Sequence, residues 1–267
     1  GDGRAEFGFG GALDSGGELS RLEIYGYDGA ARVARKRITL SLRGGSGQLP
    51  ATLLNFPKPG GGSELGLLAA VRGGTPEKPV GTLQLHHIEG ITVGTLPAVA
   101  PLPDTVFCSA PVVGDIDRDG EPEILVTASN GLLYVFDASI DAEGQPHFST
   151  KAGWPRQALA SGDDAISLAD LDGNGYPEIL TLETGGVLHA FNYNGESRVS
   201  LPHLLPSEVR YFYEAQQAPL VADLDNSGTP ELVLPLSDGQ VLAVRPDGTR
   251  YGDWNFFGGG GTGSSPA

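Results

Sequence analysis

The chain has 267 residues, including 41 Gly, 20 Pro, one Cys and no Met. Its formal net charge of −16, from 17 basic and 33 acidic side chains, disfavours binding to phosphate backbones and anionic lipids. We therefore expect no nucleic-acid partner, and no apolar run is long enough to predict membrane insertion. The absence of Met indicates a processed domain or a fragment, and the lone Cys108 cannot form an internal disulfide.

Five units of similar length follow one another along the chain, approximately 1–50, 51–107, 108–160, 161–215 and 216–267. The first two are weak copies of the others. Unit 1–50 begins with the back half of an acidic loop, and its basic stretch of Arg32, Arg35, Lys36, Arg37 and Arg43 is typical of an edge strand. Unit 51–107 has Asn55, Pro57 and Pro59 where the later units have acidic residues, followed by apolar runs at 65–71 and 83–89.

The last three units share a pattern whose first aspartates are Asp115, Asp170 and Asp223, at spacings of 55 and 53 residues. Each unit is predicted to contain a strand, an acidic loop, a strand, a turn, a third strand (132–137, 187–192 or 241–246) and a looser fourth strand. Four short strands per unit of about 50 residues are typical of a β-propeller blade. The fold class is therefore all-β, a propeller of four-stranded blades, and 207–217 is the one stretch where a short helix fits.

The acidic loops carry the chemistry. Oxygen ligands at loop positions 1, 3, 5 and 9, with a backbone carbonyl at position 7, are the ligands that Ca²⁺ prefers, and Gly at position 6 permits a tight turn. About three calcium sites are predicted, and without an ion such carboxylates repel one another. The candidate ligands are Asp115, Asp117, Asp119, Glu121 and Glu123; Asp170, Asp172, Asn174, Tyr176 and Glu178; and Asp223, Asp225, Ser227, Thr229 and Glu231.

Two other interpretations of these loops are an EF-hand and a metal-free turn. An EF-hand needs a Glu at position 12 and a following helix, but that position holds Val126, Thr181 or Leu234. Asp-Gly turns without any metal are common, but three in phase are hard to explain without an ion. If carboxylate count decides affinity, the site at 115 binds most tightly, then the site at 170, then the site at 223.

The pattern Asp-x-Asp-x-(Asp/Asn)-Gly-x-Pro-Glu, with Ala-Pro-Val-Val before it and Ile-Leu-Val after it, resembles the FG-GAP/VCBS repeats of integrin α-subunit propellers and bacterial secreted proteins. The phrase Phe-Gly-Phe-Gly-Gly-Ala, which starts at Phe7, is similar to the one that names the family. The resemblance implies a seven-bladed ring with calcium between the first and second strands of selected blades. This chain would supply five blades of that ring or, alternatively, a closed five-bladed ring, and the unit with Asn55 would bind no ion.

Other motifs carry weaker hypotheses. His86 and His87 are adjacent on a predicted strand and so point to opposite faces, which disfavours a shared metal. The glycine run at 258–263 has no following helix and is no dinucleotide site. No nucleophile motif is present, and Cys108 is favoured as a packed residue. Aromatic residues at 211–213 pack against a neighbouring blade or contribute to a binding surface.

These observations favour a non-catalytic, calcium-stabilised module that mediates adhesion or binds a protein or carbohydrate ligand. Extracellular calcium modules have Kd values of about 10⁻⁴ to 10⁻³ M, so an extracellular, cell-surface or periplasmic location is expected. The alternative is part of a secreted polysaccharide lyase, glycosidase or other hydrolase, because a fold does not fix a function.

Overall fold

The structure is a computed structural model. It describes residues 6–11, 19–28, 33–43, 51–57, 63–75, 77–89, 92–95, 99–103, 105, 107, 109–140, 146–157, 165–183, 187–197, 218–235 and 240–257. All regular secondary structure in these ranges is β, which confirms the predicted all-β class. A search of the same ranges found no helix long and apolar enough to span a membrane. The stretch 207–217 lies outside the described residues.

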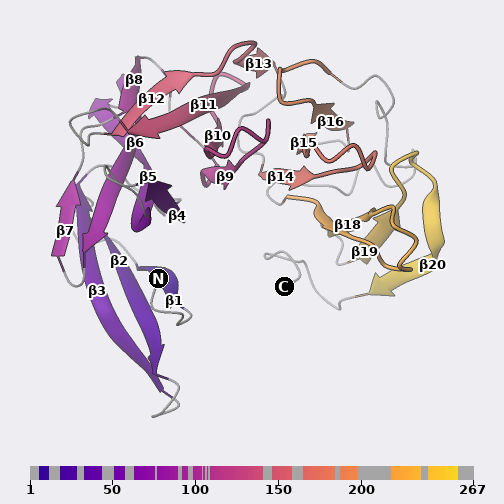
Figure 1. The fold of residues 1–267 in the computed structure, drawn as a ribbon, viewed down its shortest axis with the longest axis horizontal. Coiled ribbons are helices and arrows are strands. Elements are labelled where there is room, and N and C mark those ends of the chain that lie inside the picture. Colours follow the sequence, from indigo (N-terminus) through magenta and orange to yellow (C-terminus); the bar gives the residue numbers. More distant parts are fainter. Residues whose placement is uncertain are drawn as a thin grey trace. The chain divides into compact units, whose positions relative to one another are not determined.

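The chain packs as two compact units, of which unit 1 comprises Gly1–Pro111 and Ala138–Phe148. Its first sheet has the order β1 (Glu6–Gly11), β2 (Leu19–Asp28) and β3 (Val33–Arg43), all antiparallel. Strand β3 carries four of the five basic residues predicted for an edge strand, and it is the terminal strand of this sheet as described (Figure 1); Arg32 lies outside the described residues.

The second sheet of unit 1 contains β4 (Ala51–Pro57), β5 (Ser63–Thr75), β6 (Lys78–Glu89), β7 (Thr92–Thr95) and β8 (Val99–Pro103). Asn55 and Pro57 lie within β4 and pair with Leu65 and Ser63. Strand pairing thus continues through the positions where the later units open into an acidic loop, because this unit has no cluster of carboxylates to hold the strands apart. Pro59 lies outside the described residues.

Unit 2 comprises Val112–Asp137 and Ser149–Ala267. The sheet that begins in it contains β9 (Val112–Gly114), β10 (Glu123–Thr127), β11 (Leu132–Ile140), β12 (Pro146–Thr150) and β13 (Arg156–Gln157). The next sheet contains β14 (Ile166–Ala169), β15 (Glu178–Glu183) and β16 (Val187–Phe191). The last contains β17 (Leu220–Ala222), β18 (Glu231–Pro235), β19 (Gln240–Val244) and β20 (Arg250–Phe257). The predicted order of strand, acidic loop, strand, turn and strand is confirmed in all three sheets.

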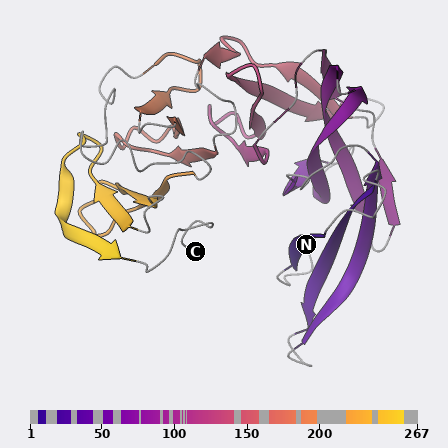
Figure 2. The same ribbon diagram turned by 180° about the vertical axis from the view of Figure 1, so that it is seen from behind.

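The sheets of unit 2 pack face to face in chain order, as both views show (Figures 1 and 2). Neighbouring residues of β15 point to opposite faces, so Ile179 packs in one hydrophobic cluster and Leu180 in the other. The first cluster joins β14–β16 to the preceding sheet, and the second joins it to the following sheet. The middle sheet is therefore buried on both faces, in line with the apolar character of its strands.

Polar and backbone contacts also link neighbouring sheets of unit 2. The indole Nε1 of Trp154 donates a hydrogen bond to the carbonyl of Tyr193 at 2.9 Å. A Cβ atom on Gly153 would lie only 2.2 Å from the carbonyl oxygen of Asn194, so this close approach requires glycine. The Ser167 hydroxyl in β14 donates to the carbonyl of Pro219, directly before β17. These contacts fix the relative position of sheets whose first and second strands carry the acidic loops.

Candidate metal-binding loops

Each sheet of unit 2 has an acidic loop between its first and second strands. We refer to residues 115–122 as the first loop, 170–177 as the second loop and 223–230 as the third loop. Each begins directly after a short strand and ends at the Pro before a buried glutamate, which opens the next strand. Position 1 is the first aspartate of each loop, and position 9 is the glutamate.

The three loops have the same backbone conformation. At position 4, Arg118, Gly173 and Asn226 have φ angles of 60°, 72° and 55°. At position 6, Gly120, Gly175 and Gly228 have φ angles of 92°, 91° and 88°. A left-handed residue is costly for most side chains, so glycine at position 6 lets the chain fold back toward its own first aspartate.

Hydrogen bonds at the two ends of the loop hold the carboxylates in place. The position-1 carboxylate accepts from the position-6 amide, at 3.1 Å for Asp115, 2.7 Å for Asp170 and 2.8 Å for Asp223. The position-9 carboxylate accepts from the position-2 amide: Ile116 donates to Glu123 and Leu171 to Glu178, each at 2.8 Å, and Leu224 donates to Glu231 at 2.9 Å. The glutamates are buried, so each brings a fixed carboxylate beneath its loop.

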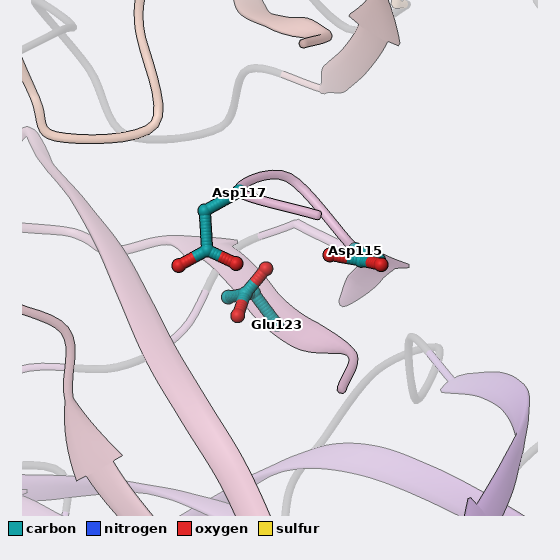
Figure 3. A group of neighbouring side chains, drawn as sticks. All are labelled: Asp115, Asp117 and Glu123. Carbon is teal, nitrogen blue, oxygen red and sulfur yellow. The ribbon is translucent and has the colours of Figure 1, made fainter. Parts of the chain in front are cut away.

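Positions 1, 3 and 9 bring three carboxylates together in every loop, with one oxygen from each within 4.8 Å of the others. In the first loop, Figure 3 shows the carboxylates of Asp117 and Glu123 turned toward one another. The prediction of three acidic groups able to hold a metal ion is thus confirmed. The groups are Asp115, Asp117 and Glu123; Asp170, Asp172 and Glu178; and Asp223, Asp225 and Glu231.

Positions 5 and 7, which were predicted as further ligands, form a local turn. The side-chain oxygen at position 5 accepts from the amide at position 7: Asp119 from Glu121 at 2.8 Å, Asn174 from Tyr176 at 2.7 Å and Ser227 from Thr229 at 3.2 Å. Asp119 and Glu121 are exposed, and the Asp119 carboxylate is not part of the three-carboxylate group. The structure therefore assigns position 5 a role in shaping the loop.

The second loop contains an oxygen that suits a cation. Among the described side chains, two buried polar atoms have no hydrogen-bond partner: the Asp170 Oδ1 and, in β15, the Thr181 Oγ1. Leaving a buried carboxylate oxygen unpaired is costly. A hard cation with oxygen ligands would satisfy the Asp170 oxygen together with the nearby carboxylates of Asp172 and Glu178, so these residues fit such an ion.

The first loop already contains a cation of its own. The buried Lys151, which directly follows β12, places its Nζ 2.7 Å from Asp117, 3.1 Å from Glu123 and 2.7 Å from Asp137. Burial favours the neutral amine, but the hydrogen bonds to these three carboxylates outweigh it and raise the pKa of Lys151. For Glu123, burial favours the neutral acid and raises the pKa, although the hydrogen bonds from the Ile116 amide and from Lys151 oppose this rise.

The third loop has a neutral side chain at the corresponding place. Tyr251 stands three residues before Trp254, as Lys151 stands three residues before Trp154. Burial and the charges of Asp225 and Glu231 raise the pKa of Tyr251, against the opposing charge of Arg245, whose guanidinium lies 5.2 Å from the centre of the Tyr251 ring. Hydrogen bonds from Ser227 hold the pKa of Asp225 below its usual value.

Sequence reasoning missed Lys151 and Asp137. Lys151 is 28 residues from Glu123, so the loop motif cannot reveal the contact. A signal was present in the sequence, because an alignment of the units on Trp154 and Trp254 also places Lys151 opposite Tyr251. Among the histidines outside the loops, His147 is exposed and His189 lies in β16, stacked on Phe191. Cys108, His203, 211–213 and 258–263 lie outside the described residues.

The comparisons with known proteins give no family. A scan against models of known protein families found no match, and a search of curated proteins found no significant similarity. Any assignment of function therefore depends on the loops themselves.

Proposed function

We propose that the chain is a non-catalytic, calcium-binding β-propeller module of a secreted or cell-surface protein. The observation that supports this best is the repeated loop geometry, in which three carboxylates meet within 4.8 Å at the same positions of three successive sheets. A single acidic turn has many explanations. Repetition of the same backbone and hydrogen bonds across three sheets favours a common ligand.

The chemistry of the ligand atoms favours calcium. Calcium takes six to eight oxygens at about 2.3 to 2.6 Å, and each loop offers carboxylates at positions 1, 3 and 9, with backbone carbonyls and water available for the remainder. Magnesium requires shorter metal–oxygen distances and near-octahedral geometry, so three carboxylates from different positions of a loop fit it less well. The ion would supply positive charge to acidic groups that otherwise repel one another, and its role is structural.

The wider biological role follows from the expected affinity. Loops with calcium Kd values of about 10⁻⁴ to 10⁻³ M fill outside the cell and stay largely empty in the cytosol. The module would then present its surface to a protein or carbohydrate ligand, with the loop carboxylates holding the ions that stabilise it.

Isothermal titration with calcium tests the proposal on the wild-type chain and on D170A and D223A. We expect each variant to lose one ion, since each removes a position-1 carboxylate. E121Q is the matched control, because it removes an exposed loop carboxylate outside the acidic groups and should bind as the wild type does. A wild-type chain that binds no calcium at 10 mM, about ten times the weakest expected Kd, would refute the proposal.

A further inference from the structure

We propose that Lys151 is the resident cation of the first loop and keeps metal out of it. This inference rests on the proposed function for the second and third loops. It reverses the order of calcium affinity that the carboxylate count predicts, in which the first loop binds most tightly. The first loop has the most acidic side chains, but its position-3 and position-9 carboxylates are already paired with an ammonium group.

Lys151 contacts two of the three carboxylates that an ion in the first loop would need. Its Nζ lies 2.7 Å from Asp117 Oδ2 and 3.1 Å from Glu123 Oε1, and both carboxylates belong to the three-carboxylate group. An ion bound to that group would lie close to the ammonium. Two positive charges in one partly buried site repel strongly, so the lysine would have to leave before the metal binds.

The surroundings favour a lysine that stays. Asp137 adds a third contact at 2.7 Å, and the Lys151 backbone amide donates to the Val135 carbonyl at 2.9 Å, which ties the residue to β11. Asp137 opposes Glu123 in the pairing of β10 with β11, so two strands present carboxylates to one ammonium. The side chain is buried, and moving it to solvent would leave these acids unpaired.

This arrangement is not repeated elsewhere among the described residues. The place of Asp137, 22 residues after the first aspartate, is taken by Asn192 and Arg245 in the following units. The place of Lys151 in the last unit is taken by the neutral Tyr251, and the Arg245 guanidinium lies 5.2 Å from the centre of its ring. Among the residues that the structure describes, the pairing of Lys151 with an aspartate of β11 is thus found only at the first loop, and exchanging Lys151 and Tyr251 tests its effect.

The test isolates the first loop in D170N/D223N, in which the other loops each lose a position-1 charge. We expect calcium titration of this variant to show no binding in the millimolar range. Adding K151M should create one site, with a calcium affinity at least on the order of a hundredfold above that of the lysine-containing loop, because a unit charge within about 4 Å of the ion is removed. K78M is the control, since Lys78 is exposed and lies outside the loops.

The reciprocal variant guards against misfolding of K151M. In Y251K a lysine is placed beside the third loop, at a partly exposed position. We expect the third loop to lose calcium affinity by a similar factor while the second loop keeps its own. Circular dichroism of each variant checks that the sheets remain folded. Unchanged calcium binding in Y251K would contradict the inference even if K151M does not fold.

The outcomes separate this inference from the proposed function. A wild-type chain that binds three ions, with D170N/D223N still binding one, overturns the inference and leaves the proposed function intact. A wild-type chain that binds none, while K151M binds one, upholds the inference and overturns the proposed function. Absence of calcium from K151M in a folded D170N/D223N background overturns the inference directly.

Discussion

In the second loop, the two carboxylate oxygens of Asp170 have different surroundings. Its Oδ2 accepts a hydrogen bond from Gly175 at 2.7 Å, whereas its buried Oδ1 has no partner. Carboxylate oxygens of Asp172 and Glu178 lie within 4.8 Å. Two unit charges at that distance repel by about 3 kcal/mol at an effective dielectric near 20, before screening by solvent. This repulsion therefore destabilises the second loop whenever no cation is bound.

Replacing Asp170 with Asn should have opposite effects with and without calcium. In EDTA, D170N keeps a carbonyl oxygen for the Gly175 amide and removes one negative charge, so we expect its Tm to rise by a few degrees. In excess calcium the wild type should be the more stable, because it binds an ion that D170N binds poorly. Thermal melts monitored by circular dichroism under both conditions measure the crossover.

E121Q serves as the control for this crossover, because it also removes one charge from an acidic loop. Its side chain is exposed and outside the acidic group, so its Tm should shift equally little in both conditions. A D170N variant that is less stable than the wild type in EDTA would show that repulsion does not dominate the calcium-free loop.

At the scale of elements, the contact between 151–155 and the turn at 192–195 joins two neighbouring sheets. Gly153 has φ of +90° and sits against the Asn194 carbonyl, and a Cβ on Gly195 would lie 2.7 Å from the Gly153 carbonyl. The Trp154 ring packs edge-on against Phe191 at a centroid distance of 5.6 Å. Two backbones thus approach each other too closely for any side chain between them.

G153A should separate these two turns and destabilise the fold by roughly 2 to 4 kcal/mol, since it combines an unfavourable φ with a backbone clash. The matched control is G252A, because Gly252 has φ of +56° but nothing within 4 Å of its would-be Cβ. We expect G252A to cost only about 1 kcal/mol. Urea unfolding of both variants compares the costs, and equal values would mean that the contact contributes nothing beyond backbone strain.

Elements with a local signal could be predicted from the sequence. The period of 55 and 53 residues located the three loops, and positions 1, 3 and 9 do come together. The hydrogen bond from the position-7 amide to position 5 could not be predicted, because an Asp side chain can bind an ion or accept an amide hydrogen bond and the motif does not distinguish them; the ligand role of position 5 stays a prediction. Lys151 was missed because its contact depends on how the fourth strand pairs with the third.

At the scale of the whole molecule, bound calcium should add stability without creating the sheets. The buried strand β10 and the two hydrophobic clusters hold unit 2 together by apolar burial, whereas the ions neutralise loops at the sheet ends. At ten times Kd, each ion contributes roughly 1.4 kcal/mol, so two filled loops contribute about 3 kcal/mol.

Chelation with EDTA should therefore lower the Tm by roughly 5 to 10 °C while the β-type circular dichroism spectrum persists below the transition. Adding calcium back should restore the Tm, and magnesium at the same concentration should restore little of it, because it needs shorter, octahedral coordination. Recovery with magnesium equal to that with calcium would contradict the assignment of the ion.

The double-sided burial of β14–β16 also bears on how the protein is made. During synthesis this sheet is complete before β17–β20 has left the ribosome, so the face that carries Leu180, Leu188 and Ala190 has no covering partner at that stage. A nascent chain with such a face is prone to sticking to other chains. We therefore expect folding of this protein in the cell to benefit from prompt translation of β17–β20, or from a chaperone that shields the exposed face of β14–β16 until then.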